Sequence, residues 1–112
     1  MNTRRPGPIF KKFSTARKAY SISAITEYEI YTGAKTAQMD LWNEFLDKTT
    51  VLPFDKEVAR MAFGINRDLK RKRKLTDTAD LLIASTALAN NLPIATLNKR
   101  HFERIEGLSI VD

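Results

Sequence analysis

The chain has 112 residues, which suits a single domain over residues 1–112 and leaves too few for a second. Hydrophobic residues make up 43% of it and charged residues 29%, and no apolar stretch reaches the roughly 20 residues of a membrane span, so we expect no membrane partner. The net charge of +6 favours a polyanionic partner, while the lack of cysteine and the single histidine exclude disulfides and multi-histidine zinc sites.

The N-terminal region, residues 1–20, is rich in Lys and Arg and lacks the continuous apolar segment and cleavage site of a secretory signal, so we expect a cytoplasmic protein. A second basic cluster consists of Lys70, Arg71, Lys72, Arg73 and Lys74. A lone run of this kind can be a solvated helix end, but the two clusters together favour contact with a phosphate backbone.

The segment "YSISAI" (residues 20–25) alternates in polarity, which predicts a short strand that leads directly into a helix. Thr26 is the expected N-cap of this helix. Glu29 lies three residues on, so "TEYE" matches the capping box, in which both side chains accept hydrogen bonds from free backbone N–H groups. We expect the helix to end near Lys35.

A second, shorter amphipathic helix is predicted by the helical spacing of Leu41, Trp42, Phe45 and Leu46. The following "TVLPF" (residues 50–54) suits a strand that its proline keeps short or at a sheet edge. We interpret Trp42 and the phenylalanines as core residues rather than as platforms on which bases stack.

Asp55 is the expected N-cap of a longer helix with one face of Lys and Arg and one apolar face. Thr76 or Asp77 is expected to cap the next helix, whose body over residues 81–88 is apolar nearly all round. Asn90 or Asn91 can supply the left-handed residue that ends it.

The segment "LPIATL" (residues 92–97) suits a buried strand, and a helical turn near Phe102 and Ile105 precedes a terminal strand in "LSIV" (residues 108–111). Strands that alternate with helices in this way predict an α/β fold with a mainly parallel sheet.

In an open parallel sheet, functional side chains gather at the carboxyl ends of the strands. Glu29 and Asn98 each follow a predicted strand, and Asp80 lies in the first turn of a helix that can face the same crevice. Oxygen-bearing side chains of this kind suit Mg²⁺ or Mn²⁺, and the implied reaction is metal-assisted cleavage of a phosphodiester.

A second interpretation stays open, because the patterns "T-x-x-E" ending at Glu29 and "D-x-x-D" ending at Asp80 also match helix N-termini. Free N–H groups and the helix dipole stabilise acids there, and spacing alone favours this capping role. His101 has basic neighbours and is expected to be a surface residue.

The stretches "SISAITEYEIYTGA" and "DLLIASTALANNLPIATLNKRHFERIEGLSIVD" together resemble the PIN-domain ribonucleases, specifically the VapC-type toxins of bacterial toxin–antitoxin pairs. The similarity covers about residues 21–112. It implies a three-layer α/β/α sandwich, Mg²⁺ or Mn²⁺ as cofactor, RNA as substrate, and a cognate antitoxin that blocks the site. Residues 70–74 would then bind RNA. Relatives commonly dimerise, so the resemblance also implies that a homodimer can form.

By this resemblance, Glu29 and Asp80 match acids that bind the metal, and Thr96 and Asn98 match a "T-x-N" motif that helps complete the site. His101 stands where many relatives carry another acid before the phenylalanine. The resemblance therefore implies a site with one carboxylate fewer at that position.

A larger departure lies at the start of the chain. The family pattern opens with a short apolar strand that ends in an aspartate metal ligand, and nothing here matches it. Residues 1–20 resemble only the basic helical region that follows this strand, so we expect a helical remnant and a sheet without its first central strand. A missing carboxylate weakens the binding of a hard divalent ion. Asp77 is an added acid to which the family pattern assigns no role.

Two functions are compatible with these features. One is a Mg-dependent endoribonuclease that acts as a toxin, and the other is a catalytically inactive, truncated remnant that binds antitoxin or RNA. A basic nucleic-acid-binding module unrelated to nucleases is disfavoured, because the charges follow no helix-turn-helix or β-platform pattern.

Overall fold

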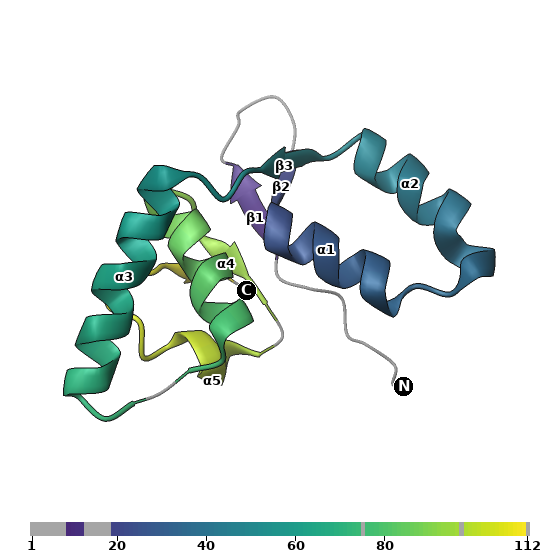
Figure 1. The fold of residues 1–112 in the computed structure, drawn as a ribbon. Helices are drawn as coiled ribbons and strands as arrows, with labels where there is room; N and C mark the ends of the chain where they lie inside the picture. The colour runs from purple at the N-terminus through teal and green to yellow at the C-terminus, as the bar shows by residue number, and fades with distance from the viewer. Residues whose placement is uncertain (1–8, 13–18, 75, 97, 112) are drawn as a thin grey trace.

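The computed structural model describes residues 9–12, 19–74, 76–96 and 98–111 (Figure 1). Its strands are β1 (Ile9–Lys12), β2 (Ala19–Ser23), β3 (Thr50–Leu52), β4 (Ile94–Ala95) and β5 (Ile110–Val111). Its helices are α1 (Ala24–Gly33), the 3₁₀ turn η1 (Thr36–Gln38), α2 (Met39–Asp47), α3 (Lys56–Arg71), α4 (Thr78–Ala89) and α5 (Lys99–Phe102). This alternation of strands and helices confirms the predicted α/β fold.

The strands form one sheet in the order β3-β2-β1-β4-β5. β2 pairs with β3 in parallel, and so does β4 with β5. The central strand β1 runs antiparallel to both of its neighbours, and Phe10 at its middle is in register with Ser21 on one side and Ile94 on the other. β2, β3, β4 and β5 therefore all run in one direction, which confirms the prediction of a mainly parallel sheet, and β1 is the one described strand that runs the other way.

β1 also corrects the expectations for the N-terminal region. Residues 9–12 and 19–20 are strands rather than parts of a helical remnant, and β1 occupies the central place that was expected to be empty. Residues 1–8 and 13–18 of that region lie outside the described residues. Only six residues connect β1 to β2, and a connection this short permits an antiparallel pair but not a parallel crossover.

Local capping signals place most of the remaining elements as predicted. The Asp55 carboxylate accepts a hydrogen bond from the Val58 N–H at 3.0 Å and so caps α3. Asn91 adopts the left-handed conformation after α4, with φ of 55°. β3 ends directly before Pro53 and lies at an edge of the sheet, as expected.

The core lies around α4 and the strands behind it. It contains the buried side chains of Leu69, Ile83, Ala84, Ala87, Ile94, Phe102 and Ile105. Phe102 confirms the interpretation of phenylalanines as core residues, but Phe45, Phe54 and Phe63 are exposed, which contradicts it. Periodicity alone could not separate these cases, because exposure depends on whether another element covers the helix face.

Figure 1 shows α3 and α4 packed side by side, and α1 and α2 as a second pair beyond the strands β1 to β3. α3 and α4 are antiparallel neighbours, so the C-terminal end of α3 lies beside the N-terminal end of α4. Within the described residues, no helix is long and apolar enough to cross a membrane.

Candidate active site

The N-terminus of α4 carries the two acids that the sequence marks as candidates. Asp77 occupies the N-cap position, and its backbone carbonyl accepts a hydrogen bond from the Leu81 N–H at 2.9 Å, but its carboxylate makes no capping bond. Asp80 lies in the first turn of the helix. The capping interpretation is therefore right for the position of Asp77 and wrong for the bonding of its side chain.

Asp80 is paired with His101 on α5. The distance from Asp80 Oδ2 to His101 Nδ1 is 3.1 Å, and the two side chains are 18% and 56% exposed. His101 is a surface residue, as expected, but its contact with Asp80 was not predicted. The two residues are 21 positions apart in the chain, so no helical or strand spacing could have signalled the pair.

The surroundings of Asp80 alter its acidity. Burial raises the pKa of the Asp80 carboxyl above its ordinary value, the nearby Asp77 carboxylate raises it further, and the hydrogen bond from His101 acts in the opposite direction. The net shift is upward. Asp80 therefore keeps its proton to a higher pH than a solvated aspartate, which is common among functional carboxyls in clefts.

The turn between β4 and α5 brings His101 to this place. The Thr96 hydroxyl accepts a hydrogen bond from the Asn98 N–H at 3.0 Å, and the Asn98 carbonyl accepts one from the His101 N–H at 3.0 Å. Asn98 is also the N-cap residue of α5. Thr96 and Asn98, which the resemblance predicts to help complete the site, thus belong to the same hydrogen-bonded turn as His101.

Glu29 lies in the second turn of α1, because this helix begins earlier than predicted. Ser23 is the N-cap: its hydroxyl accepts a hydrogen bond from the Thr26 N–H at 3.0 Å and donates one to the Thr26 hydroxyl at 3.1 Å. The predicted capping box of Thr26 and Glu29 is therefore wrong. Glu29 is half-buried and does not serve as a cap.

The described acids near Asp80 are of the type that binds a divalent metal ion, but there are too few of them to complete a metal site. Carboxylate oxygens from Asp77 and Asp80 are ligands that Mg²⁺ prefers. Among the residues that the structure describes, however, no three His, Cys, Asp or Glu side chains are grouped closely enough to hold a metal ion. His101 also occupies one oxygen of Asp80. The described carboxylates would therefore need further ligands, such as water or a substrate phosphate, to hold a metal ion.

The basic cluster of residues 70–74 lies at the end of α3 and in the turn that leads toward α4. Asp68 pairs with Arg71 and, at 3.0 Å, with Lys72. The hydrogen bond from Lys72 and the charges of both cations hold the pKa of the Asp68 carboxyl below its ordinary value. Two of the five predicted RNA-binding side chains thus already share an acid partner.

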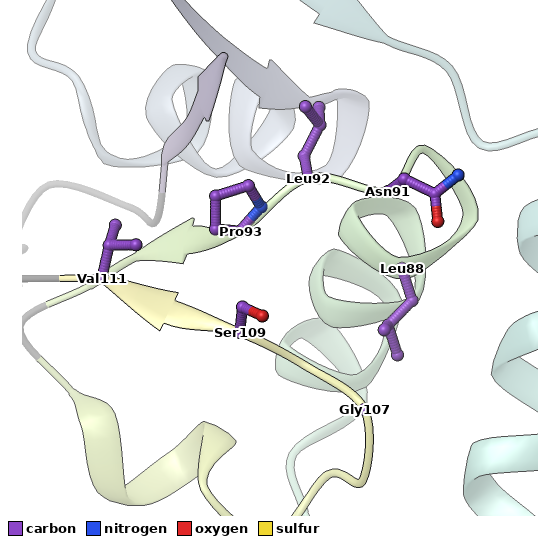
Figure 2. A pocket seen from close by; sticks show the side chains of 7 residues that line it. All are labelled: Leu88, Asn91, Leu92, Pro93, Gly107, Ser109 and Val111. Atoms are coloured by element: carbon purple, nitrogen blue, oxygen red, sulfur yellow. The ribbon is translucent and has the colours of Figure 1, made fainter. Parts of the chain in front are cut away.

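A cavity of about 500 Å³ opens at the other end of α4, between Leu88 and Val111 on β5. Figure 2 shows the residues that line it. None of the predicted site residues belongs to this lining. The candidate active site is therefore the Asp80–His101 pair with the turn before α5, and the cavity is a separate feature.

Comparisons with known proteins agree with this fold. The sequence profile of the PIN domain family matches residues 5–108. Ribonuclease VapC1 of Methanocaldococcus jannaschii is 39% identical over 95 residues, which are 82% of this chain and 70% of the relative. The tRNA(fMet)-specific endonuclease VapC of Shigella flexneri is 30% identical over 96% of this chain and 86% of its own length.

A solved structure is similar over a comparable span. The DNA-bound VapBC of Salmonella typhimurium superposes with a TM-score of 0.76 and 32% identity, covering 80% of this chain and 72% of that chain. Sequence and structure thus point to the same set of relatives.

Proposed function

The chain belongs to the PIN domain family, and from this premise we propose that it is a VapC-type endoribonuclease, the toxin of a toxin–antitoxin pair. The observation that carries the proposal is the 39% identity over most of the chain to a protein named as a VapC ribonuclease. The match to a VapBC structure supports a cognate antitoxin as partner. We propose RNA as the substrate and the cytoplasm as the location, and a homodimer as a further assembly.

The residues that we propose for catalysis are Glu29, Asp80 and Asn98. Asp80 and His101 share a hydrogen bond and can hold a proton between them, next to the turn that contains Asn98. Asp77, Thr96 and His101 support this site. Residues 70–74 are proposed to bind the RNA backbone through their charge.

We propose Mg²⁺ or Mn²⁺ as the cofactor, with Glu29 and Asp80 as ligands. Mg²⁺ is often held by one or two carboxylates together with substrate phosphates and water. This arrangement suits a chain in which the described acids are too few to hold the ion alone. The metal would supply charge stabilisation to the reacting phosphodiester.

A second candidate function is a chain that binds antitoxin or RNA without cleaving it. The specific observation in its favour is that no three acids or histidines are grouped as metal ligands within the described residues. A reduced set of carboxylates weakens the affinity for a hard divalent ion.

Cleavage of labelled tRNA(fMet) and of total RNA by the purified chain separates the two functions. We expect cleavage in Mg²⁺ or Mn²⁺ that stops on chelation, and a loss of about 100-fold or more in rate for Asp80→Ala. Asp40→Ala is the matched control, because Asp40 is also an acid in the first turn of a helix but is exposed on α2. RNA binding without any cleavage by the unsubstituted chain would favour the inactive alternative.

A further inference from the structure

The outer face of α3 carries a regular row of cations around one aromatic ring. Lys56, Arg60, Phe63, Arg67 and Lys70 follow one another at intervals of four, three, four and three residues, and we call them the α3 stripe. This spacing places them on one face of a helix. All five are exposed, whereas Val58, Ala62 and Leu69 on the opposite face are buried.

Phe63 is an unusual residue for a solvent-facing position. Its side chain is 63% exposed, and the Arg67 guanidinium lies 5.5 Å from the centre of its ring. A guanidinium at this distance is attracted to the face of the ring. The next residue, Gly64, adds no side chain, and even a Cβ built there would have no neighbour within 4 Å. The ring is thus bordered by open surface.

The charge of the α3 stripe is not neutralised by nearby acids. Residues 56–74 contain eight Lys and Arg but only two acids. One of these acids, Asp68, pairs with Arg71 and Lys72 outside the stripe. Within the described part of the chain, Lys56, Arg60 and Lys70 form no ion pair. The stripe therefore presents a positive potential on both sides of Phe63.

We propose that the α3 stripe binds single-stranded RNA, with an unpaired base stacked on Phe63 and the neighbouring phosphates on Arg60, Arg67 and Lys70. An aromatic ring within a row of cations is how proteins hold single strands without reading their sequence. A paired base cannot offer its face to the ring, so the surface selects unpaired segments. The stripe ends with Lys70 in the last turn of α3, and Asp80 lies in the first turn of α4. Figure 1 shows these two helix ends side by side.

The choice of RNA as the ligand rests on the proposed function, but the surface can be tested without cleavage. A short fluorescent single-stranded RNA is titrated with the full chain carrying Asp80→Asn, which prevents turnover, and anisotropy is measured. Phe63→Ala is expected to weaken binding about tenfold, and Phe63→Trp to preserve it. Phe63→Leu keeps an apolar side chain without a ring face and should weaken binding as Ala does.

Phe45→Ala provides the matched control. Phe45 is also exposed, at 44%, but it lies on α2, whose charged residues are all acidic. Its removal should leave RNA affinity unchanged. Arg60→Gln and Lys70→Gln should each lower the slope of log affinity against log salt by about 0.7, the value for one phosphate contact on a single strand.

An equal loss for Phe63→Ala and Phe45→Ala, or an unchanged affinity for Phe63→Ala, would overturn the proposal. The proposal would also be overturned if Phe63→Ala lowered the affinity for an RNA duplex as much as the affinity for the single strand. Cleavage of RNA by the unsubstituted chain with no effect of Phe63→Ala on binding would reject this surface and leave the ribonuclease intact. If the chain binds RNA in a way that depends on Phe63 but never cleaves it, the proposed RNA-binding surface is supported and the proposed ribonuclease function is rejected.

Discussion

The partial burial of the Asp80 carboxyl group makes the free energy of unfolding depend on pH. Burial raises its pKa above the ordinary 3.8, so the folded state holds this proton more tightly than the unfolded state does. The free energy of unfolding therefore falls as the pH rises from about 3.8 through the raised pKa. At neutral pH the folded protein carries the full cost of the charge.

Asp80→Asn removes that charge but keeps the shape of the side chain. We expect the free energy of unfolding at pH 7 to rise by no more than about 1 kcal/mol, because solvent screens a half-buried group and the bond to His101 weakens. The gain should disappear near pH 4. Urea unfolding at both pH values measures it, with Asp40→Asn on the surface as control. A protein that is less stable at pH 7 would contradict the expectation.

His101 occupies an oxygen of Asp80 that a metal would need. His101→Asp replaces the ring with a second carboxylate near Asp80. We expect Mn²⁺ to bind about tenfold more tightly in a calorimetric titration, a change of about 1.4 kcal/mol. His101→Asn, which adds no charge, should give a smaller gain. Equal affinities for both variants would argue against Asp80 as a ligand.

Helix α3 contains a position outside the α3 stripe at which the stability of the fold can be changed. Gly64 lies within it, and an added Cβ would meet no atom within 4 Å. We expect Gly64→Ala to raise the free energy of unfolding by about 0.8–1.0 kcal/mol, because alanine loses less backbone entropy in a helix. Gly107→Ala is the contrasting control, since φ there is +85° and a side chain would be strained. Denaturant unfolding of both variants provides the measurement.

Asp68 lies on the same helix. Removing its charge should strengthen the proposed binding of RNA, whereas removing a cation of the α3 stripe should weaken it. Asp68→Asn frees Arg71 and Lys72 from their shared partner, so we expect tighter RNA binding and a salt slope steeper by up to about 1.4 for two new phosphate contacts. Glu57→Gln removes the same charge but releases no pair that the structure describes, and its effect should be smaller. Anisotropy at several salt concentrations compares the two.

Over the whole molecule, the sheet depends on its antiparallel centre. β1 is paired on both sides, and without it β2 and β4 would each expose a row of unpaired backbone groups. We therefore expect the amide protons of residues 10 and 11 to exchange about as slowly as those of α4, through global unfolding. Hydrogen exchange measures both in one sample. Rapid exchange in β1 beside a protected α4 would show that the centre of the sheet opens independently.

The chain is also divided by charge. The charged residues of α2 are all acidic, whereas residues 56–74 are strongly basic, and Figure 1 shows these helices on opposite sides of the strands. Such a separation orients a polyanion toward α3 before contact. RNA and an acidic partner segment would compete for the same side.

Short-range features of the fold could be predicted from the sequence. Asp55 caps α3 and Asn91 ends α4 as expected, because a cap or a left-handed residue acts on backbone groups within four residues. The apolar face of α3 follows from its periodicity for the same reason. The position of Asp80 in the first turn of α4 was predicted on these grounds.

The sequence by itself thus determined the elements after residue 20, the cap of α3, the end of α4 and the acids at the start of α4. Only the tertiary structure decided that His101 meets Asp80, that β1 enters the sheet antiparallel, and that Phe63 remains exposed. Each of these outcomes depends on which distant segment covers a given group. Burial, strand direction and a hydrogen bond between residues 21 positions apart depend on how the whole chain packs. The spacing of neighbouring residues therefore cannot predict them.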